Sequence, residues 1–171
     1  AITSEKQTIG EISTGAAGGL AFTLGKLKVG QVLVPPLIEA VKDVPRVESW
    51  IIYDAPPGAT CPVVTTLRGA DFVLLVTEPT PFGRHGLAQA VELVRQLDIP
   101  CGVVINRTNG HGGQVESFCI REGIEILARI PFRREVAAAC AEGGLAVDVH
   151  PEVAASLSGL FHNLRSREVL A

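Results

Sequence analysis

The chain has 171 residues, a length typical of one globular domain, and a chain near this size buries about 70% of the surface that its unfolded form exposes. Apolar residues make up 47% of the sequence and charged residues only 19%, which excludes a globally disordered chain and a coiled coil. Fifteen Lys and Arg residues against eighteen Asp and Glu residues give a net charge of -3. The composition therefore argues against nucleic acid as a partner.

The four cysteines, at positions 61, 101, 119 and 140, are far apart and form no C-x-x-C pair. This spacing indicates neither a zinc site nor a disulfide framework, so we expect reduced thiols and a cytoplasmic setting. The sequence has no apolar run long enough to span a bilayer, and residues 1–6 lack the basic start and apolar centre of a signal peptide. We therefore predict no membrane insertion.

The first 48 residues predict a β-hairpin followed by a connecting helix. Two apolar stretches, residues 8–13 and 20–27, are separated by three glycines, which is typical of a hairpin connection. A helix is expected over residues 36–41. The stretch 42–48 is too short to separate domains, so we predict a single domain over residues 1–171.

From residue 49 onward, short apolar runs alternate with segments of helical period. Strands are predicted at residues 50–54, 72–77, 102–106 and 125–130, and the first three are continuous apolar runs, as in strands buried on both faces. The apolar positions that mark the intervening and closing helices are Leu87, Val91, Val94 and Leu97, then Val115, Phe118 and Cys119, then Val153, Leu157, Leu160, Phe161 and Leu164. The pattern predicts an α/β fold: a doubly wound, mostly parallel sheet with flanking helices, plus the amino-terminal hairpin.

Polar and backbone-constraining residues follow the predicted strands, where open parallel sheets bind their ligands. Asp54 is the last residue of the first predicted strand and opens the string DAPPG. A carboxylate at a strand tip can hold a water ligand of a phosphate-bound Mg²⁺, while Gly58 permits a close main-chain approach to a terminal phosphate. The competing interpretation is that Asp54 only opens a turn.

Asn106, at the end of the third predicted strand, offers a hydrogen-bond donor and an acceptor side by side, the pattern that pairs with the N6 and N7 edge of adenine. Asn is also a common turn former, so a purely structural role stays open. Pro131 and Phe132 follow the fourth strand. These two residues either flank a base or simply end the strand.

Three further residues have simpler interpretations. Cys61 lies near a predicted helix start, where the helix dipole favours a thiolate, but burial as a small apolar residue is the interpretation that we expect. We predict that His85 and His111 are solvated and take no part in chemistry.

The phosphate cradle of P-loop proteins, G-x-x-x-x-G-K-[ST], does not occur in the sequence. The nearest string, GLAFTLGKL at residues 19–27, has one residue too many between its glycines and a leucine in place of the hydroxyl residue. Without these groups a triphosphate loses most of its contacts and Mg²⁺ loses one ligand. We therefore expect the chain to bind nucleotide poorly by itself.

The ordered strings DAPPGATCPV, VLLVTEPTPFGRHGL, VVINR and EGIEILARIPF resemble the carboxy-terminal half of MinD/ParA-type P-loop ATPases, and more narrowly the branch with an inserted bacterial-type ferredoxin. The resemblance covers residues 1–141. It implies that this chain is a carboxy-terminal portion, with the P-loop and the cluster cysteines in a missing amino-terminal portion. Arg133 departs from the pattern, because relatives usually have an acidic residue there.

The resemblance also implies roles and partners. Asp54 is the expected acidic residue of the magnesium site and contributes to ATP hydrolysis in the full-length protein, whereas the portion alone is expected to be inactive. The nucleotide-binding residues that it implies are Pro57, Gly58, Asn106, Arg107, Pro131 and Phe132. A homodimer, and a client in iron–sulfur or redox-cofactor assembly, are expected for the full-length protein.

Two other classes of function are compatible with the sequence. The first is a non-enzymatic interaction module that lacks a P-loop and uses its sheet to bind a partner. The second is an ATP-dependent amide-forming synthase on the same fold, which needs a pocket for a substrate carboxylate that the sequence does not reveal. A P-loop and cluster motifs encoded upstream would favour the ATPase over the module.

Overall fold

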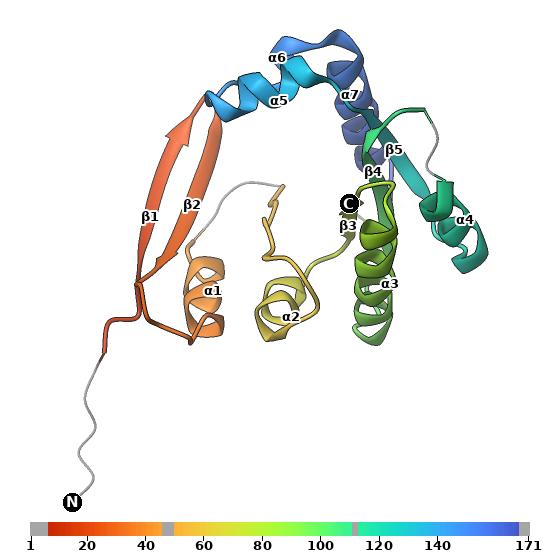
Figure 1. Ribbon diagram of the computed structural model, residues 1–171. Coiled ribbons are helices and arrows are strands. Elements are labelled where there is room, and N and C mark those ends of the chain that lie inside the picture. The colour runs from red at the N-terminus through yellow and green to blue at the C-terminus, as the bar shows by residue number, and fades with distance from the viewer. Residues whose placement is uncertain (1–6, 46–49, 111–112, 168–171) are drawn as a thin grey trace, which may run out of the picture. The chain divides into compact units, whose positions relative to one another are not determined.

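The computed structural model describes residues 7–45, 50–110 and 113–167. The chain divides into two compact units, residues 1–68 and residues 69–171. The first unit holds a hairpin and two helices, and the second holds a parallel sheet with its own helices (Figure 1). Among the described residues, no helix is both long and apolar enough to cross a membrane.

The hairpin of the first unit is formed by β1 (Gly10–Ala17) and β2 (Leu20–Leu27), which pair antiparallel. Gly18 and Gly19 make the turn, with φ of +57° and +82°, in the left-handed region that glycine adopts without a steric penalty. The predicted hairpin is therefore confirmed. The first strand runs further than predicted and includes Gly15, because the Phe22 ring opposite fills the space where a side chain at residue 15 would lie.

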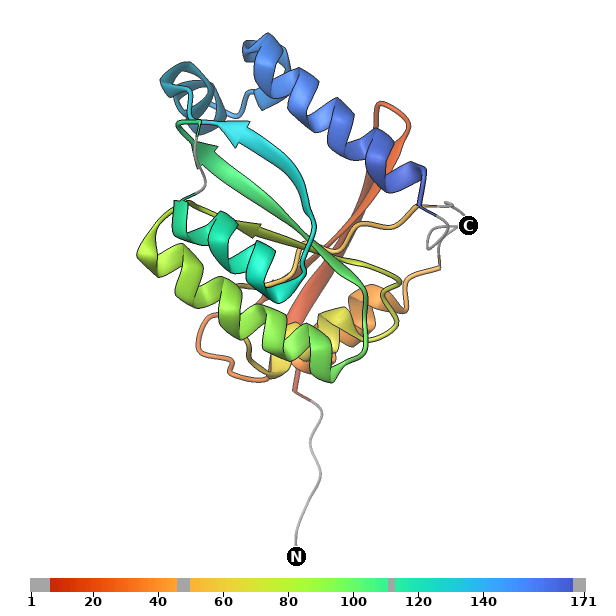
Figure 2. The ribbon, with the colours of Figure 1, turned by 90° about the vertical axis from the view of Figure 1, so that its right-hand side faces the viewer.

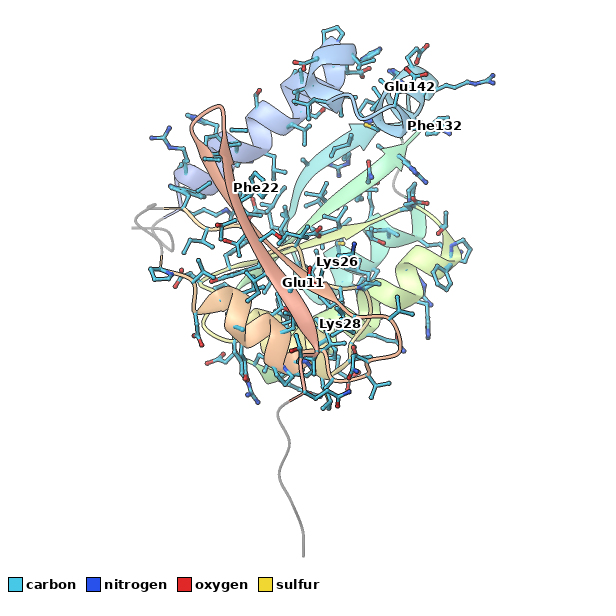
Figure 3. All side chains as sticks on the ribbon, turned by 90° about the vertical axis from the view of Figure 1, so that its left-hand side faces the viewer. Glu11, Phe22, Lys26, Lys28, Phe132 and Glu142 are labelled. Atoms are coloured by element: carbon cyan, nitrogen blue, oxygen red, sulfur yellow. The ribbon has the colours of Figure 1, made fainter. Side chains whose placement is uncertain are left out.

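The two faces of the hairpin have different surroundings. One face packs on α1 (Pro35–Lys42), whose Leu37 occupies the space that side chains at Gly10 and Gly25 would need. On the other face Glu11 and Lys26 stand directly opposite each other, a favourable cross-strand arrangement (Figure 3). The predicted connecting helix is confirmed, and the glycines set how closely it approaches the hairpin.

A lysine holds the two helices of the first unit together. Lys42, the last residue of α1, donates from Nζ to the carbonyl oxygens of Thr65, Thr66 and Arg68 at 3.2, 3.1 and 2.5 Å. These carbonyls belong to the end of α2 (Cys61–Leu67), where a helix has carbonyl groups without intrahelical partners. Lys42 therefore caps α2 from outside.

The predicted strand at residues 50–54 is wrong. This segment is irregular and lies outside both sheets of the described residues, which have the orders β1-β2 and β3-β4-β5. An apolar run becomes a strand only when a neighbouring strand offers its backbone groups, and in the first unit β1 and β2 pair with each other. Ile52 remains 87% exposed, so the run is not buried on both faces.

The sheet of the second unit contains β3 (Val73–Thr77), β4 (Cys101–Thr108) and β5 (Ile126–Pro131), all parallel and in that order. The crossovers between them are α3 (Pro81–Gln96) and α4 (Gly113–Glu122). The last three predicted strands are therefore confirmed. The chain continues through α5 (Arg134–Ala141), α6 (Ala146–Val149) and α7 (Pro151–Arg165).

Helices cover both faces of this sheet, which makes it doubly wound (Figure 2). Val103 and Ile105 of β4 pack in one cluster with α3 and α4. Val104 points to the opposite face and packs with Leu160 of α7. Successive residues of a strand alternate between faces, so this continuous apolar run fits a strand buried on both sides.

Two irregularities shift the register between β4 and β5. Leu127 is an extra residue in β5, and its side chain occupies the space beside Gly102. Further along, the register passes from Ile105 opposite Arg129 to Thr108 opposite Pro131, so β4 has one residue more than β5 over this stretch. Such bulges re-aim side chains, and this second bulge contains Asn106 and Arg107.

Candidate functional site

The carboxyl ends of β3, β4 and β5 bring several predicted residues to one edge of the sheet. Arg107, near the end of β4, donates from Nη1 to Oε1 of Glu78, just after β3, at 2.9 Å. The backbone N–H of Phe132, just after β5, donates to the carbonyl oxygen of Thr108 at 3.0 Å. Both contacts tie neighbouring strand ends together.

Asn106 is half-buried at this edge, and its Oδ1 accepts a hydrogen bond from the backbone N–H of Arg107 at 2.9 Å. Asn106 lies within β4, in a bulge and not in a turn, and this hydrogen bond gives it a local structural role there. The same bond leaves the amide group of the side chain and the second lone pair of Oδ1 available for other partners. A structural role and a binding role are therefore compatible at Asn106.

Pro131 is the last residue of β5 and Phe132 follows it, in agreement with the interpretation that these residues end the strand. Pro131 is half-buried and opposite Thr108 in the register. The Phe132 side chain is 45% exposed at the same end of the sheet (Figure 3). An exposed aromatic ring beside polar strand ends offers a surface on which a planar base can stack.

The string TEPTPFG is explained by the tight connection from β3 to α3. Thr80 caps the helix by accepting the N–H of Gly83 at 2.9 Å, and Thr77 donates from Oγ1 to the carbonyl oxygen of Gly83 at 3.0 Å. A β-carbon on Gly83 would lie 2.3 Å from the carbonyl oxygen of Glu78, which is too close. This part of the string therefore encodes a backbone geometry.

Glu78 is the residue that the sequence analysis did not select for the site. The structure adds it through its ion pair with Arg107. The sequence signal that could have indicated this pair is an acidic residue after β3 and a basic residue near the end of β4. That signal depends on knowing that β3 and β4 are neighbours, which the sequence order alone does not establish.

Arg133, the departure from the family pattern, has an internal structural role. It forms an ion pair with Glu152 in the first turn of α7. Its Nε also donates to Nε2 of His150 at 3.3 Å, so His150 accepts with that nitrogen. Arg133 therefore ties the end of β5 to the start of α7.

Asp54, Pro57 and Gly58 belong to the first unit and lie in an irregular, exposed segment. Gly58 has φ of +94° and open space around it, so the backbone at this position needs glycine while its surroundings stay accessible. Asp54 also lines a groove of about 660 Å³ within the same unit, together with residues of the hairpin and α1. The carboxylate is accessible, but it does not follow a strand.

A single accessible carboxylate is compatible with a magnesium site that is completed by a nucleotide. Mg²⁺ is commonly held by one or two carboxylates together with phosphate oxygens and waters. Within the described part of the chain, no group of three or more His, Cys, Asp and Glu side chains is placed to hold a metal ion. Asp54 fits the role of one ligand or of a partner for a water ligand.

Three further residues complete the comparison with the sequence. Cys61 is exposed at the first position of α2, so its predicted burial is wrong: the buried side of this helix is formed by Val63 and Thr66. His85 is exposed, as predicted. His111 lies outside the described residues.

Two curated proteins of Methanocaldococcus jannaschii are similar to the chain in sequence, and no family model matches it. Uncharacterized protein MJ0579 is 33% identical over 108 residues, which are 62% of this chain and 40% of that protein. Uncharacterized protein MJ0578 is 27% identical over 150 residues, which are 86% of this chain and 51% of that protein. The chain thus spans about half the length of the curated relatives it matches.

Among solved structures, the chain is similar to the septum site-determining protein MinD of Pyrococcus horikoshii, which is complexed with Mg-ADP. The match covers 81% of this chain and 58% of that chain, with 19% sequence identity and a TM-score of 0.61. MinD of Aquifex aeolicus gives a TM-score of 0.62 at 18% identity, over 78% and 60% of the two chains. The chain has the fold of MinD-type P-loop ATPases.

Proposed function

We propose that this chain is part of an ATP-binding protein of the MinD/ParA class, to which it contributes the adenine-binding edge of the sheet and an acidic residue of the magnesium site. The fold supports this proposal, and the P. horikoshii protein of this fold binds Mg-ADP. The observation that carries it is the sheet edge of the second unit. There a half-buried carboxamide, Asn106, and an exposed ring, Phe132, come from neighbouring strand ends.

The two groups suit an adenine base. The Phe132 ring offers an apolar face for stacking, while the Asn106 amide can donate to N7 and its oxygen can accept from the 6-amino group. Pro131, rigid in φ, fixes the position of the ring that follows it. We assign Arg107 to the same part of the site, next to Asn106.

Asp54, Pro57 and Gly58 are assigned to the phosphate end of the nucleotide. Bound Mg²⁺ supplies charge neutralisation on the phosphates. The Asp54 carboxylate would hold a ligand of that ion, and the open backbone at Gly58 allows a phosphate to approach the main chain. Pro57 stiffens the connection between them.

The phosphate-binding loop is assigned to another part of the full-length protein. The sequence lacks the string G-x-x-x-x-G-K-[ST], and the chain spans 40% and 51% of its two curated relatives. We extend the proposal to an inserted ferredoxin, a homodimer, a cytoplasmic location and a client in iron–sulfur or redox-cofactor assembly. These finer assignments are supported by the sequence strings, and the cytoplasmic one also by the four free cysteines.

ATP hydrolysis by two forms of the protein tests this proposal. We expect no phosphate release above background from the 171-residue chain with MgATP, and turnover from the full polypeptide of the same reading frame. In that polypeptide Asp54→Asn should lower turnover by about two orders of magnitude, because the metal contributes several kcal/mol of charge stabilisation. Asp43→Asn, an exposed carboxylate of the same unit, is the matched control and should change little.

Two results would contradict the proposal. The first is ATP hydrolysis above background by the 171-residue chain alone. The second is a full reading frame that encodes no phosphate-binding loop, which would favour the non-enzymatic interaction module.

A further inference from the structure

Arg107 adopts a backbone conformation that is uncommon for a residue with a side chain. Its φ is +55°, in the left-handed region, and it lies in the bulge where β4 has one residue more than β5. In this conformation its backbone N–H meets Oδ1 of Asn106 at 2.9 Å. The unusual backbone at residue 107 and the orientation of the Asn106 side chain are thus coupled.

The side chain of Arg107 is connected to a well-fixed part of the neighbouring strand. Its partner Glu78, at 2.9 Å, begins the connection from β3 to α3. That connection is held by the Thr77 and Thr80 hydrogen bonds to Gly83, and Gly83 packs directly against the Glu78 carbonyl group. The ion pair therefore ties a strained residue of β4 to a rigid turn of β3.

The hydrogen bond from Arg107 allows the Asn106 carboxamide only one orientation. The backbone N–H is a donor, so it must face the oxygen of the carboxamide. A flipped side chain would bring its amide group against this N–H and place two donors together. The amide group of Asn106 is consequently the part that stays free for a ligand, together with the second lone pair of Oδ1.

We propose that Arg107 and Glu78 are positioning residues that hold the Asn106 carboxamide in one orientation and thereby select a 6-amino purine over a 6-oxo purine. This inference rests on the proposed function. In the held orientation Oδ1 accepts from a 6-amino group while the amide donates to N7. A 6-oxo purine presents an acceptor to that oxygen. The held carboxamide therefore keeps its hydrogen bond to N7 of a 6-oxo purine but sets Oδ1 against the 6-oxo oxygen. A released carboxamide could move so that its amide group lies between the 6-oxo oxygen and N7 and donates to both, with Oδ1 turned away, so release of Asn106 should reduce selectivity.

The test compares ATP with ITP, its 6-oxo counterpart, in titrations of the ¹⁵N-labelled chain at millimolar nucleotide, followed by the NMR signals of Asn106 and Phe132. The wild-type chain should prefer ATP roughly tenfold, as one well-placed bidentate contact allows. Glu78→Gln and Arg107→Ala should each lower the ratio by about two- to fivefold, because the ion pair joins two exposed side chains and such pairs contribute modestly. Arg107→Lys, which keeps the charge, should retain part of the preference.

The controls separate positioning from a general loss of structure. Arg129 and Glu116 form another ion pair of the same unit, at 2.6 Å, and Glu116→Gln should leave the ratio unchanged. Arg107→Gly accepts a positive φ without strain but lacks the ion pair. It should fold at least as well as Arg107→Ala and keep more of the preference, because its backbone N–H can stay on Oδ1 of Asn106 without strain. Protection of the Arg107 amide from hydrogen exchange should fall in Glu78→Gln and not in Glu116→Gln.

The possible outcomes distinguish this inference from the proposed function. A preference for ATP that is undiminished in Glu78→Gln and Arg107→Ala overturns the positioning role and leaves the adenine site in place. An equal loss of preference in Glu116→Gln also overturns it. If Asn106 and Phe132 of the wild-type chain respond to neither nucleotide, the proposed adenine site fails and this inference fails with it.

Discussion

Burial separates the four cysteines into two classes at the scale of single residues. Cys119 is buried in the cluster that joins α3 and α4 to the sheet, and Cys101 is half-buried at the start of β4. Burial raises the pKa of both thiols above the ordinary value of 9.0, because the charged thiolate is poorly solvated there. Cys61 and Cys140 are exposed.

The raised pKa of Cys119 predicts a loss of stability at alkaline pH. The thiol ionises near pH 9.0 in the unfolded chain and at higher pH in the folded chain. Between these values the folded state binds more protons, so the contribution of Cys119 to the free energy of unfolding is constant below pH 9.0 and falls as the pH rises through the folded pKa. Urea unfolding at neutral and alkaline pH should show a smaller fall in Cys119→Ala.

Cys140→Ala, at an exposed position, provides the control for this experiment. It should lose stability at alkaline pH as the wild-type chain does. The interpretation is contradicted if Cys119→Ala and the wild-type chain have the same pH dependence.

For physical reasons, the sequence indicates where in the fold some residues of the candidate site lie and gives no indication for others. Asn106 and Phe132 could be placed, because they follow apolar runs and parallel strands bring their carboxyl ends to one edge. The ion pair of Glu78 and Arg107 could not be predicted, because it depends on the order of the strands and on a bulge for which the local sequence has no recognisable pattern. Arg133 likewise finds its partner Glu152 only through the tertiary structure.

At the scale of secondary-structure elements, α3 contains two glycines in different surroundings. The space for a β-carbon at Gly83 is occupied by backbone, with the Glu78 carbonyl oxygen at 2.3 Å, and Gly86 has open space around it. Both positions belong to the same helix. The start of α3 therefore packs closely against the connection from β3, while a larger side chain at Gly86 meets no obstacle.

This difference predicts opposite effects of the same substitution. Gly83→Ala should lower the free energy of unfolding by about 1–3 kcal/mol, because the connection must shift. Gly86→Ala should raise it by up to about 1 kcal/mol, because alanine favours a helix. Chemical denaturation of both variants measures the two values, and a similar effect of both substitutions would contradict the packing described for Gly83.

Elements were predictable where the local pattern carries enough information. The hairpin was found from its paired glycines, and β3, β4 and β5 from apolar runs bounded by turns. The segment 50–54 has the same apolar character but no strand to pair with in the described part of its unit. The hydrophobicity of a segment indicates that its burial is favourable. Strand formation also requires backbone hydrogen bonds to a neighbouring strand.

At the scale of the whole molecule, each of the two units carries its own part of the proposed function. We propose that an adenine base binds at the sheet edge of the second unit, around Asn106 and Phe132. We propose separately that the exposed segment of the first unit, around Asp54 and Gly58, holds the magnesium ion of a nucleotide. The binding of adenine at the sheet edge is the central claim.

NMR titration with ATP, in the presence of Mg²⁺ or Mn²⁺, tests this claim most directly. With millimolar MgATP the signals of Asn106 and Phe132 should shift, and with Mn²⁺ in place of Mg²⁺ the signals of residues around Asp54 and Gly58 should broaden. Without ATP the effect at Asp54 should be weak, and Asp54→Asn should remove it. Broadening of Asp54 that does not depend on ATP, or ATP-induced shifts that spare both Asn106 and Phe132, would contradict the account.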